Sequence, residues 1–305
     1  MDIGKKIKKL RTEKLMTQSE LTGGEITRNM LSRIENGAAL PSLGTVIYLA
    51  SKLGVPAGYL LSEGEEEFIY HKTSVMKNIR RAYIDKHFEI CRDMCLTEFE
   101  EFDGFDDELE LILTDCCIGI AEESIRIGQL RKACIFLDEA VIHSRNTMFD
   151  TTTQKNSIAI MFGLLKEISP ALDSNETDTV ISEDLFHPSI FGSIFCKYIT
   201  VILDIEHYRL FTNDLENHPE IVLNEDEMLF VRHLKARKQI HDKDFSSALT
   251  TLRSVIDADT VPQRLLLYMA CADMEICCRE TDDYKGAYEF SQNKLDLLEH
   301  MLSEV

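Results

Sequence analysis

The sequence predicts an all-α protein in two parts: a small N-terminal domain of five short helices, and a right-handed superhelix of helical hairpins after it. Three observations support this fold class. Apolar residues recur at helical spacing along most of the chain, without the alternation that marks strands. Capping residues and glycines divide the first 62 residues into short helical segments. Beyond residue 70, similar units return about every forty residues.

The charge is divided unevenly between the two parts. The whole sequence has a formal net charge of −20, yet residues 1–62 hold nine basic and five acidic residues, a net charge of +4. The remainder therefore carries −24 and forms an acidic body. A negatively charged partner suits only the first part. Because the composition changes at "LLSEGEEEF", we expect domains at residues 1–62 and 71–305, joined by a linker at 63–70.

Cysteine usage and hydropathy indicate a cytoplasmic protein that does not enter membranes. The nine cysteines lack the paired spacing of a zinc site, and we expect them to be reduced and to fill helical cores. The N-terminus "MDIGKKIKKLRTEK" is basic but has no apolar run of a secretory signal. The longest apolar runs, such as "AIMFGLL", are much shorter than the ~18 residues that a membrane span needs.

The first two helices have clear boundary signals. Asp2 can cap a helix in which the apolar residues between Ile3 and Leu10 share one face and the lysines lie on the other. In "TQSE", Thr17 and Glu20 have the spacing of a capping box, which begins the second helix. The glycine pair at positions 23 and 24 then suits a tight turn.

Three more helices complete this part. The third is predicted over Arg28–Glu35, with Thr27 as its cap and Gly37 placed to end it in a left-handed conformation. Ser42 begins a fourth helix that runs to about residue 54, and Pro56 suits the first turn of a fifth, "PAGYLL". Five short helices with a tight turn between the second and third make a helix-turn-helix domain.

These residues also resemble a known family. Across residues 3–61, the segments "TQSEL", "ITRNMLSRIENG" and "PSLGTVIYLASKLGVPAGYLL" are similar to the XRE-type, lambda-repressor-like helix-turn-helix. The turn between the second and third helices is one residue shorter than the usual pattern. The resemblance implies a domain that binds double-stranded DNA and reads bases from the early part of its third helix.

The third helix has a face that suits this role. Leu31 and Ile34 lie on one side, where they can pack into the core, and four polar residues lie on the other: Arg28, Asn29, Ser32 and Arg33. Arginine can bind guanine through two hydrogen bonds, and asparagine can pair with adenine. We therefore expect Arg28 and Asn29, beside the capping residue Thr27, to be the first readers of bases, and Ser32 and Arg33 to contact bases or phosphates.

Phosphate contacts are expected at the edges of this face. By the same resemblance, Gln18 and the backbone around Asn36 contact phosphate groups. Met30 could touch a thymine methyl, but its position favours a residue at the boundary of the core. "GAALPS", which follows Asn36, holds no basic residue, so one copy should bind phosphates weakly. We therefore expect a homodimer on a palindromic operator with half-sites ~34 Å apart or a multiple of that distance.

The acidic body contains repeated units. The clearest are "GQLRKACIFLDEAV", "KDFSSALTTLRSVI" and "DDYKGAYEFSQNKL", in each of which a large residue precedes a small one by three positions. These pairs are Leu130/Ala133, Phe245/Ala248 and Tyr284/Ala287, with weaker copies at Phe88/Cys91, Ile168/Ala171 and Tyr208/Phe211. A period near forty resembles tetratricopeptide-type repeats, whose stacked hairpins form a superhelix with a concave groove.

A helix-turn-helix domain followed by such repeats resembles the peptide-responsive regulators of Gram-positive bacteria of the RRNPP type. The resemblance implies a homodimer that binds a short signalling peptide in the concave groove of the repeats and changes its DNA binding in response. Polar side chains on inner helices would then hold the peptide. The candidates are Arg80, Arg126, Asn156, Arg232 and Lys235.

Other classes have less support in the sequence. It contains no phosphate-binding glycine loop, nucleophile elbow or zinc-protease motif, and we expect no enzyme, no cofactor and no metal site. A protein-binding adaptor would not need the polar face on the third helix. A helix-turn-helix repressor that binds no peptide remains open as an alternative.

Overall fold

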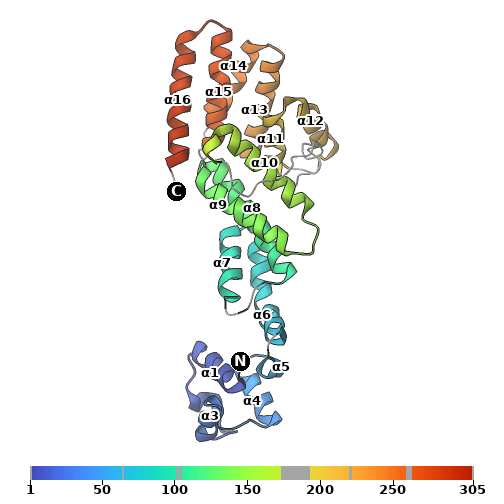
Figure 1. Ribbon diagram of the computed structural model, residues 1–305, viewed down its shortest axis with the longest axis vertical. Helices are drawn as coiled ribbons and strands as arrows, with labels where there is room; N and C mark the ends of the chain where they lie inside the picture. Colours follow the sequence, from blue (N-terminus) through green and yellow to red (C-terminus); the bar gives the residue numbers. More distant parts are fainter. Residues whose placement is uncertain are drawn as a thin grey trace. The chain divides into compact units, whose positions relative to one another are not determined.

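The computed structural model describes residues 2–63, 65–100, 102, 105–172, 193–219, 222–258 and 263–303. These residues are overwhelmingly helical, and the β-pairing found among them is a single bridge between Gly23 and Ile26. The chain divides into two compact units. The N-terminal unit comprises Met1–Ala82 with Glu100–Phe102, and the repeat unit comprises Tyr83–Phe99 with Asp103–Val305 (Figure 1).

The N-terminal unit begins with the five expected helices. They are α1 (Ile3–Glu13), α2 (Gln18–Thr22), α3 (Arg28–Glu35), α4 (Leu43–Leu53) and α5 (Ala57–Leu61). Asp2, Thr17, Thr27 and Ser42 each accept a hydrogen bond from a backbone amide at the start of a helix, and Thr17 forms the predicted capping box with Glu20. Pro56 is the N-cap of α5, one position before its first helical residue.

Two glycines allow these short helices to approach closely. A Cβ atom on Gly4 would lie 2.0 Å from the carbonyl oxygen of Ile34, so α1 contacts the end of α3 at this point. Gly23 has a φ of +51°, and a Cβ there would lie 2.3 Å from the hydroxyl of Tyr48, which donates to the carbonyl of Thr22 at 2.8 Å. The tight turn before α3 therefore depends on a glycine for both its backbone and its packing.

Lys6 departs from the expectation that the lysines of α1 are solvated. Its side chain is buried, at 1% exposure, because acceptors from α5 and from the helix that follows surround its ammonium group. Nζ donates to the carbonyls of Ser62 at 2.5 Å and Tyr59 at 3.2 Å, and it lies 3.2 Å from Oε2 of Glu67. A buried lysine is stable when paired in this way, and here it fixes the end of α5.

The segment expected to be a linker is mostly helical. The long helix α6 (Glu65–Ile84) begins at Glu65 and covers most of residues 63–70. The glutamates there suit the first turn of a helix, where negative charge is stabilised, as well as they suit a linker. Most of α6 belongs to the N-terminal unit, so this unit extends beyond residue 62.

The repeat unit is built from the remaining helices. They are α7 (Phe88–Glu98), α8 (Asp107–Ile127), α9 (Leu130–Asn146), α10 (Thr152–Ile168), α11 (Ile194–Leu203), α12 (Tyr208–Asn217), α13 (Glu225–His241), α14 (Phe245–Ile256), α15 (Arg264–Glu280) and α16 (Tyr284–Ser303), with the 3-10 helices η1 (Pro170–Leu172) and η4 (Ile205–His207). Helices α8 and α9, α13 and α14, and α15 and α16 pack as hairpins, and α15 and α16 lie side by side in Figure 1.

The repeated large residues mark helix starts. Five of the six begin a helix: Phe88, Leu130, Tyr208, Phe245 and Tyr284. The sixth, Ile168, was assigned wrongly, because it is the last residue of α10. That helix is apolar around most of its circumference, so periodicity alone did not locate its end.

The hairpin turns share one backbone conformation. A residue with positive φ stands two positions before the second helix in four turns: Lys86 (57°), Gly128 (90°), Lys243 (64°) and Asp282 (60°). In each turn its amide donates to the carbonyl three residues earlier. Only one of the four is a glycine, the residue that favours this conformation.

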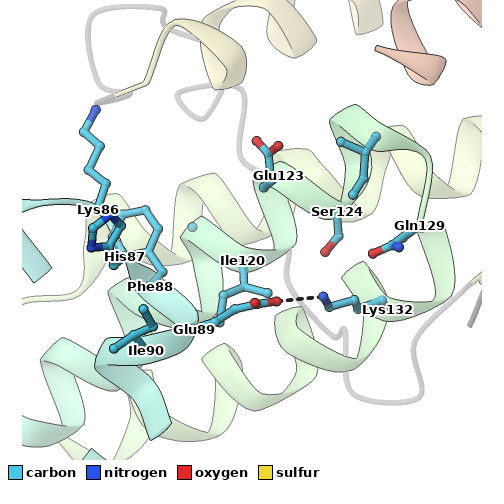
Figure 2. A pocket seen from close by; sticks show the side chains of 12 residues that line it. Lys86, His87, Phe88, Glu89, Ile90, Ile120, Glu123, Ser124, Gln129 and Lys132 are labelled. Atoms are coloured by element: carbon cyan, nitrogen blue, oxygen red, sulfur yellow. Dashed lines mark hydrogen bonds and ion pairs between the residues drawn. The ribbon is translucent and has the colours of Figure 1, made fainter. Parts of the chain in front are cut away.

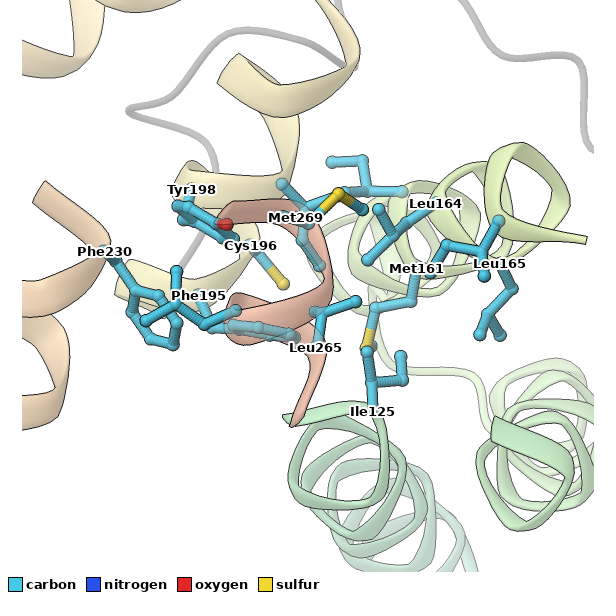
Figure 3. Packing of buried hydrophobic residues seen from close by; sticks show 14 of the residues in the cluster. Ile125, Met161, Leu164, Leu165, Phe195, Cys196, Tyr198, Phe230, Leu265 and Met269 are labelled. Carbon is cyan, nitrogen blue, oxygen red and sulfur yellow. The ribbon is translucent and has the colours of Figure 1, made fainter. Parts of the chain in front are cut away.

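The repeats bury one continuous apolar cluster. Ile125 of α8, Met161 of α10, Phe195 of α11, Phe230 of α13 and Leu265 of α15 all belong to it (Figure 3). Helix α15 contacts α8, and α16 contacts α9, so the last hairpin packs against the α8/α9 hairpin as well as against its sequence neighbour. The Nε atom of Arg131 donates to the carbonyl of Leu302 at 2.8 Å across this contact. Among the helices in the described ranges, none has the length and hydropathy to cross a bilayer.

Candidate DNA-binding interface and ligand-binding residues

Helix α3 presents the polar face that the sequence predicts. Thr27, Arg28, Asn29 and Arg33 are exposed, and Ser32 is half-buried. On the opposite side Leu31 and Ile34 are almost completely buried in the core of the N-terminal unit. The exposed side chains offer a guanidinium and an amide near the start of the helix, where major-groove readers are found in helix-turn-helix domains.

A chain of hydrogen bonds holds the start of this face. Arg11 and Glu35 form a two-contact ion pair, from Nε to Oε1 at 2.6 Å and from Nη2 to Oε2 at 3.1 Å. Gln18 donates through Nε2 to Oε2 of Glu35 at 2.8 Å, and its own Oε1 accepts from Nε of Arg28 at 3.4 Å. The ion pair thus orients Gln18, and Gln18 in turn restrains Arg28.

The Arg11–Glu35 pair was missed from the sequence. Glu35 is only 4% exposed although it is charged, and the hydrogen bond to its carboxylate raises the pKa of Arg11. The two residues are 24 positions apart, and the sequence pattern marks Glu35 only as the end of the third helix. Glu35 shares a face of the predicted helix with Leu31 and Ile34, and a charged residue in such a position can indicate a buried ion pair.

At the two edges of this polar face, Asn36 is exposed and Gln18 is half-buried. Asn36 is the C-cap of α3, and Gly37 follows with a φ of +71°. Met30 is 41% exposed, consistent with a position at the boundary of the core. Leu40 is 88% exposed, so the segment without basic residues presents apolar surface after α3.

Arg126 is held by neighbours within the repeat unit. Its guanidinium carbon lies 5.4 Å from the ring centre of Phe230 and 5.9 Å from that of Phe195, and Nη2 lies 3.8 Å from Oδ2 of Asp226. Burial raises the pKa of the adjacent Glu122, although Arg126 opposes that shift. Arg126 is therefore a stacked cation between α8, α11 and α13, with 19% of its side chain exposed.

The other peptide-binding candidates lie on three helices other than that of Arg126. Asn156 is half-buried on α10, and Arg232 and Lys235 are exposed on α13. Arg80 is exposed on α6 and belongs to the N-terminal unit. The shared role of these residues in peptide binding stays a prediction.

A buried polar chain crosses the repeat core. Tyr198 Oη lies 2.9 Å from Nδ1 of His233, whose Nε2 lies 3.1 Å from Oδ2 of Asp273. Burial raises the pKa of Tyr198, so the phenol stays protonated and can donate. Tyr198 and His233 form a hydrogen bond, whereas Nε2 of His233 and Oδ2 of Asp273 lie close together without hydrogen-bond geometry among the described residues. Within the described ranges, no group of three or more His, Cys, Asp or Glu side chains is arranged to hold a metal ion.

A pocket of about 490 Å³ lies where α7, α8 and α9 meet. Figure 2 shows residues from the start of α7, the second half of α8 and the start of α9 around it. Its apolar wall includes Phe88, Ile120 and Ile127. This pocket could not be predicted from the sequence, because its lining comes from three helices and two turns.

Comparison with protein families identifies the N-terminal domain. The helix-turn-helix family matches residues 7–60. These residues therefore form a DNA-binding helix-turn-helix domain, as predicted. A comparison with curated proteins finds no significant match.

Three solved structures match nearly the whole length of this chain at low sequence identity. PlcR of Bacillus thuringiensis, in complex with the peptide PapR7 and DNA, is 17% identical and covers 100% of this chain and 99% of its own, with a TM-score of 0.24. ComR of S. thermophilus, in complex with DNA and its signalling peptide ComS, is 16% identical with coverages of 97% and 99% and a TM-score of 0.25. A mutant of PrgX is 15% identical, with coverages of 93% and 99% and a TM-score of 0.27. At these TM-scores the likeness assigns no ligand to this chain.

Proposed function

We propose that this chain, with its N-terminal helix-turn-helix domain, is a homodimeric transcription regulator whose binding to a palindromic operator is controlled by a short peptide bound to the repeats. The observation that carries the proposal is the exposed polar face of α3, held by the Arg11–Glu35–Gln18–Arg28 chain. A preorganised arginine at the start of a reading helix suits direct contact with a guanine edge.

The reading face is tested with DNA selected by the full-length protein from a random duplex pool. Arg28→Ala should weaken binding to the selected operator by ~1–3 kcal/mol and relax the sequence preference at one base position. Fluorescence anisotropy at several salt concentrations measures both effects. Arg253→Ala, which removes an exposed arginine from α14, is the matched control. Equal affinity of Arg28→Ala and the parent protein for operator and scrambled DNA would refute the assignment.

Self-association is proposed to use an apolar stripe on α16. Tyr284, Tyr288 and Leu295 are 69%, 66% and 46% exposed, and their spacing places them near one face of the helix. A homodimer needs a surface that pairs with its own copy, and exposed aromatic side chains are enriched at such surfaces. The N-terminal domain is only weakly basic, so one copy should bind DNA weakly and two copies should be needed.

Sedimentation of the full-length protein tests this surface. Tyr288→Asp should shift the dimer toward monomer without loss of helical circular dichroism, because a carboxylate would be buried in the contact. Ile142→Asp, at an exposed apolar position on α9, should leave the dimer unchanged. A monomeric parent protein, or a Tyr288→Asp dimer as tight as the parent, would contradict the proposal.

Peptide control is tested separately from DNA binding. Short synthetic peptides that the full-length protein retains from a mixed pool are added to the operator titration, and the operator Kd should change. If the operator binds as expected but no retained peptide changes its Kd, the repressor without a peptide ligand is the correct function. The supporting observation for a small ligand is the pocket between α7, α8 and α9, whose volume falls within the usual range for ligand sites.

A further inference from the structure

The pocket between α7, α8 and α9 lies beside the N-termini of two helices. Its lining includes Phe88, Glu89 and Ile90, the first three residues of α7, and Gln129, the N-cap of α9. The first amides of a helix lack intrahelical acceptors and favour a negative charge nearby. Both helices are long enough for this effect, with 11 residues in α7 and 17 in α9.

Neither helix start is occupied by its own capping side chain. No side-chain cap hydrogen bond is formed by His87 or Gln129, the two N-cap residues. The matching turn residue before α14 is Asp244, which accepts from the amide of Ser247, and Asp283 before α16 accepts from Gly286. Helices α5, α10, α12 and α15 also lack a side-chain cap, and α7 and α9 differ from them because residues at their starts line the pocket.

Polar side chains inside the pocket point to the same kind of ligand. Ser124 is only 2% exposed and lines the pocket, and within the described part of the chain its hydroxyl forms no hydrogen bond (Figure 2). This hydroxyl is open to the pocket rather than sealed in the core, so a ligand there can bond to it. Lys86 is exposed at the pocket rim and forms no salt bridge with a described residue.

Among the cations at the pocket, Lys86 is the one without a salt bridge to a described residue, although its charge also acts on the carboxyl of Glu122 on α8. The ammonium of Lys132 is already paired with Oε1 of Glu89 at 2.7 Å, as Figure 2 shows. Glu123 is 64% exposed and lies 3.8 Å from Nη1 of Arg126. The remaining wall is apolar, formed by Phe88, Ile90, Ile120 and Ile127. The lining thus combines two uncapped helix starts and one cation with an apolar surface.

We propose that this pocket binds a carboxylate joined to an apolar side chain, as the carboxyl-terminal residue of a peptide provides. The carboxylate lies at the start of α7 near Lys86, and the side chain packs on Ile120 and Ile127 toward α9. This inference rests on the proposed peptide control and specifies where the end of the peptide binds. The site is on the side of α8 that faces α7 and α9, whereas Arg126 faces α11 and α13.

A glycine at position 86 removes the positive charge without straining the turn. It has a φ of +57°, so Lys86→Gly removes the ammonium while the turn keeps a conformation that glycine prefers. Lys243 occupies the same position in the turn before α14, with a φ of +64°. Lys243→Gly is therefore a matched control that makes the same change in charge and backbone at a turn that does not line the pocket.

The test uses the full-length protein labelled at isoleucine methyl groups and observed by NMR. N-acetyl-leucine should shift the Ile120 and Ile127 signals saturably, and N-acetyl-leucine amide, which lacks the charge, should bind more weakly. Lys86→Gly should weaken N-acetyl-leucine binding about two- to fivefold, as expected for one exposed cation, and Lys243→Gly should leave it unchanged. Equal binding of acid and amide, or no shift at these methyl groups, would overturn the proposal.

A longer probe separates the two possible sources of the carboxylate. N-acetyl-Gly-Gly-Leu with a free carboxyl end should bind at least as tightly as N-acetyl-leucine if the natural ligand is a peptide. If the longer probe is excluded while the single residue binds, the pocket takes a small carboxylic acid and the peptide assignment is wrong. A retained peptide that alters operator binding without shifting Ile120 and Ile127 would refute the pocket alone and leave peptide control intact.

Discussion

The guanidinium of Arg11 and the carboxylate of Glu35 form a largely buried ion pair between α1 and α3, with contacts of 2.6 Å and 3.1 Å. Nη1 of Arg11 also donates to the carbonyl of Met16 at 2.8 Å. Removing one partner of such a pair leaves the other charge buried without compensation. Arg11→Met should therefore destabilise the N-terminal unit by about 3 kcal/mol and weaken operator binding.

Hydrogen exchange of the full-length protein measures this loss locally. Peptides from residues 3–53 should exchange faster in Arg11→Met, and peptides from α13–α16 should be unaffected. Arg33→Met, at an exposed position on α3, should leave exchange unchanged although it can alter DNA binding. Unchanged protection in Arg11→Met would show that the ion pair does not hold α1 against α3.

The shared turn conformation predicts opposite effects at two equivalent positions. Lys243→Gly should stabilise the protein by ~0.5–1 kcal/mol, because relief of the left-handed conformation exceeds the entropy that glycine adds to the unfolded chain. Gly128→Ala should destabilise it by about 2 kcal/mol or more. The added Cβ would take a φ of +90° and lie 2.7 Å from Cγ of Met301 and 3.0 Å from Cβ of Arg264.

Urea unfolding followed by circular dichroism separates the backbone strain from the steric clash in Gly128→Ala. Met301→Ala removes the nearest obstacle, so it should restore part of the stability lost in Gly128→Ala, beyond the sum of the separate changes. Additive effects would mean that the backbone conformation alone causes the loss. A destabilised Lys243→Gly would contradict the strain assigned to these turns.

Local features of the fold could be predicted from the sequence. The caps at Thr17, Thr27 and Ser42 depend on residues three positions away, and the left-handed residue Gly37 depends on its own lack of a side chain. The polar face of α3 could also be predicted from the sequence, because helical spacing separates Leu31 from its polar neighbours.

Features that depend on distant contacts could not be predicted. Lys6 is buried because carbonyls more than fifty positions away accept from it. Arg126 is stacked on Phe195 and Phe230, and no local pattern places those rings beside α8. The pocket likewise requires α7, α8 and α9 to meet, although the uncapped residues His87 and Gln129 gave a partial signal in the sequence.

Acidification should weaken the α15/α16 hairpin through Glu275. Burial alone would raise the pKa of this carboxyl, but ion pairs with Lys294, at 2.6 Å, and with Arg279 outweigh it and lower the pKa below its ordinary value. A lowered folded-state pKa contributes stability above the unfolded value of about 4.3, and that stability is lost as the pH falls through the folded value.

Glu275→Gln tests this contribution. The free energy of unfolding should fall by about 1–2 kcal/mol at pH 7, and its decline below pH 5 should be shallower than in the parent protein. Glu289→Gln is the control, because its pair with Lys285 is exposed and 3.7 Å long, so a change below about 0.5 kcal/mol is expected. Parallel pH profiles for Glu275→Gln and the parent would exclude Glu275 as the titrating group.

The nine free cysteines should react slowly with a thiol reagent in the native protein. Burial raises the pKa of Cys117 to about 12, of Cys277 to about 12 and of Cys134 to about 11, so few of these thiols are thiolates at pH 8. Hydrogen bonds from Cys116 and Cys95 lower the pKa of Cys91, but that side chain is completely buried and a reagent does not reach it. Cys134 is the half-buried one, so it should react first, and Cys134→Ser should remove that phase. Titration with the thiol reagent in guanidinium chloride should detect all nine cysteine thiols. A native thiol that reacts as fast as free glutathione would contradict this burial, because a reactive cysteine needs both exposure and a lowered pKa.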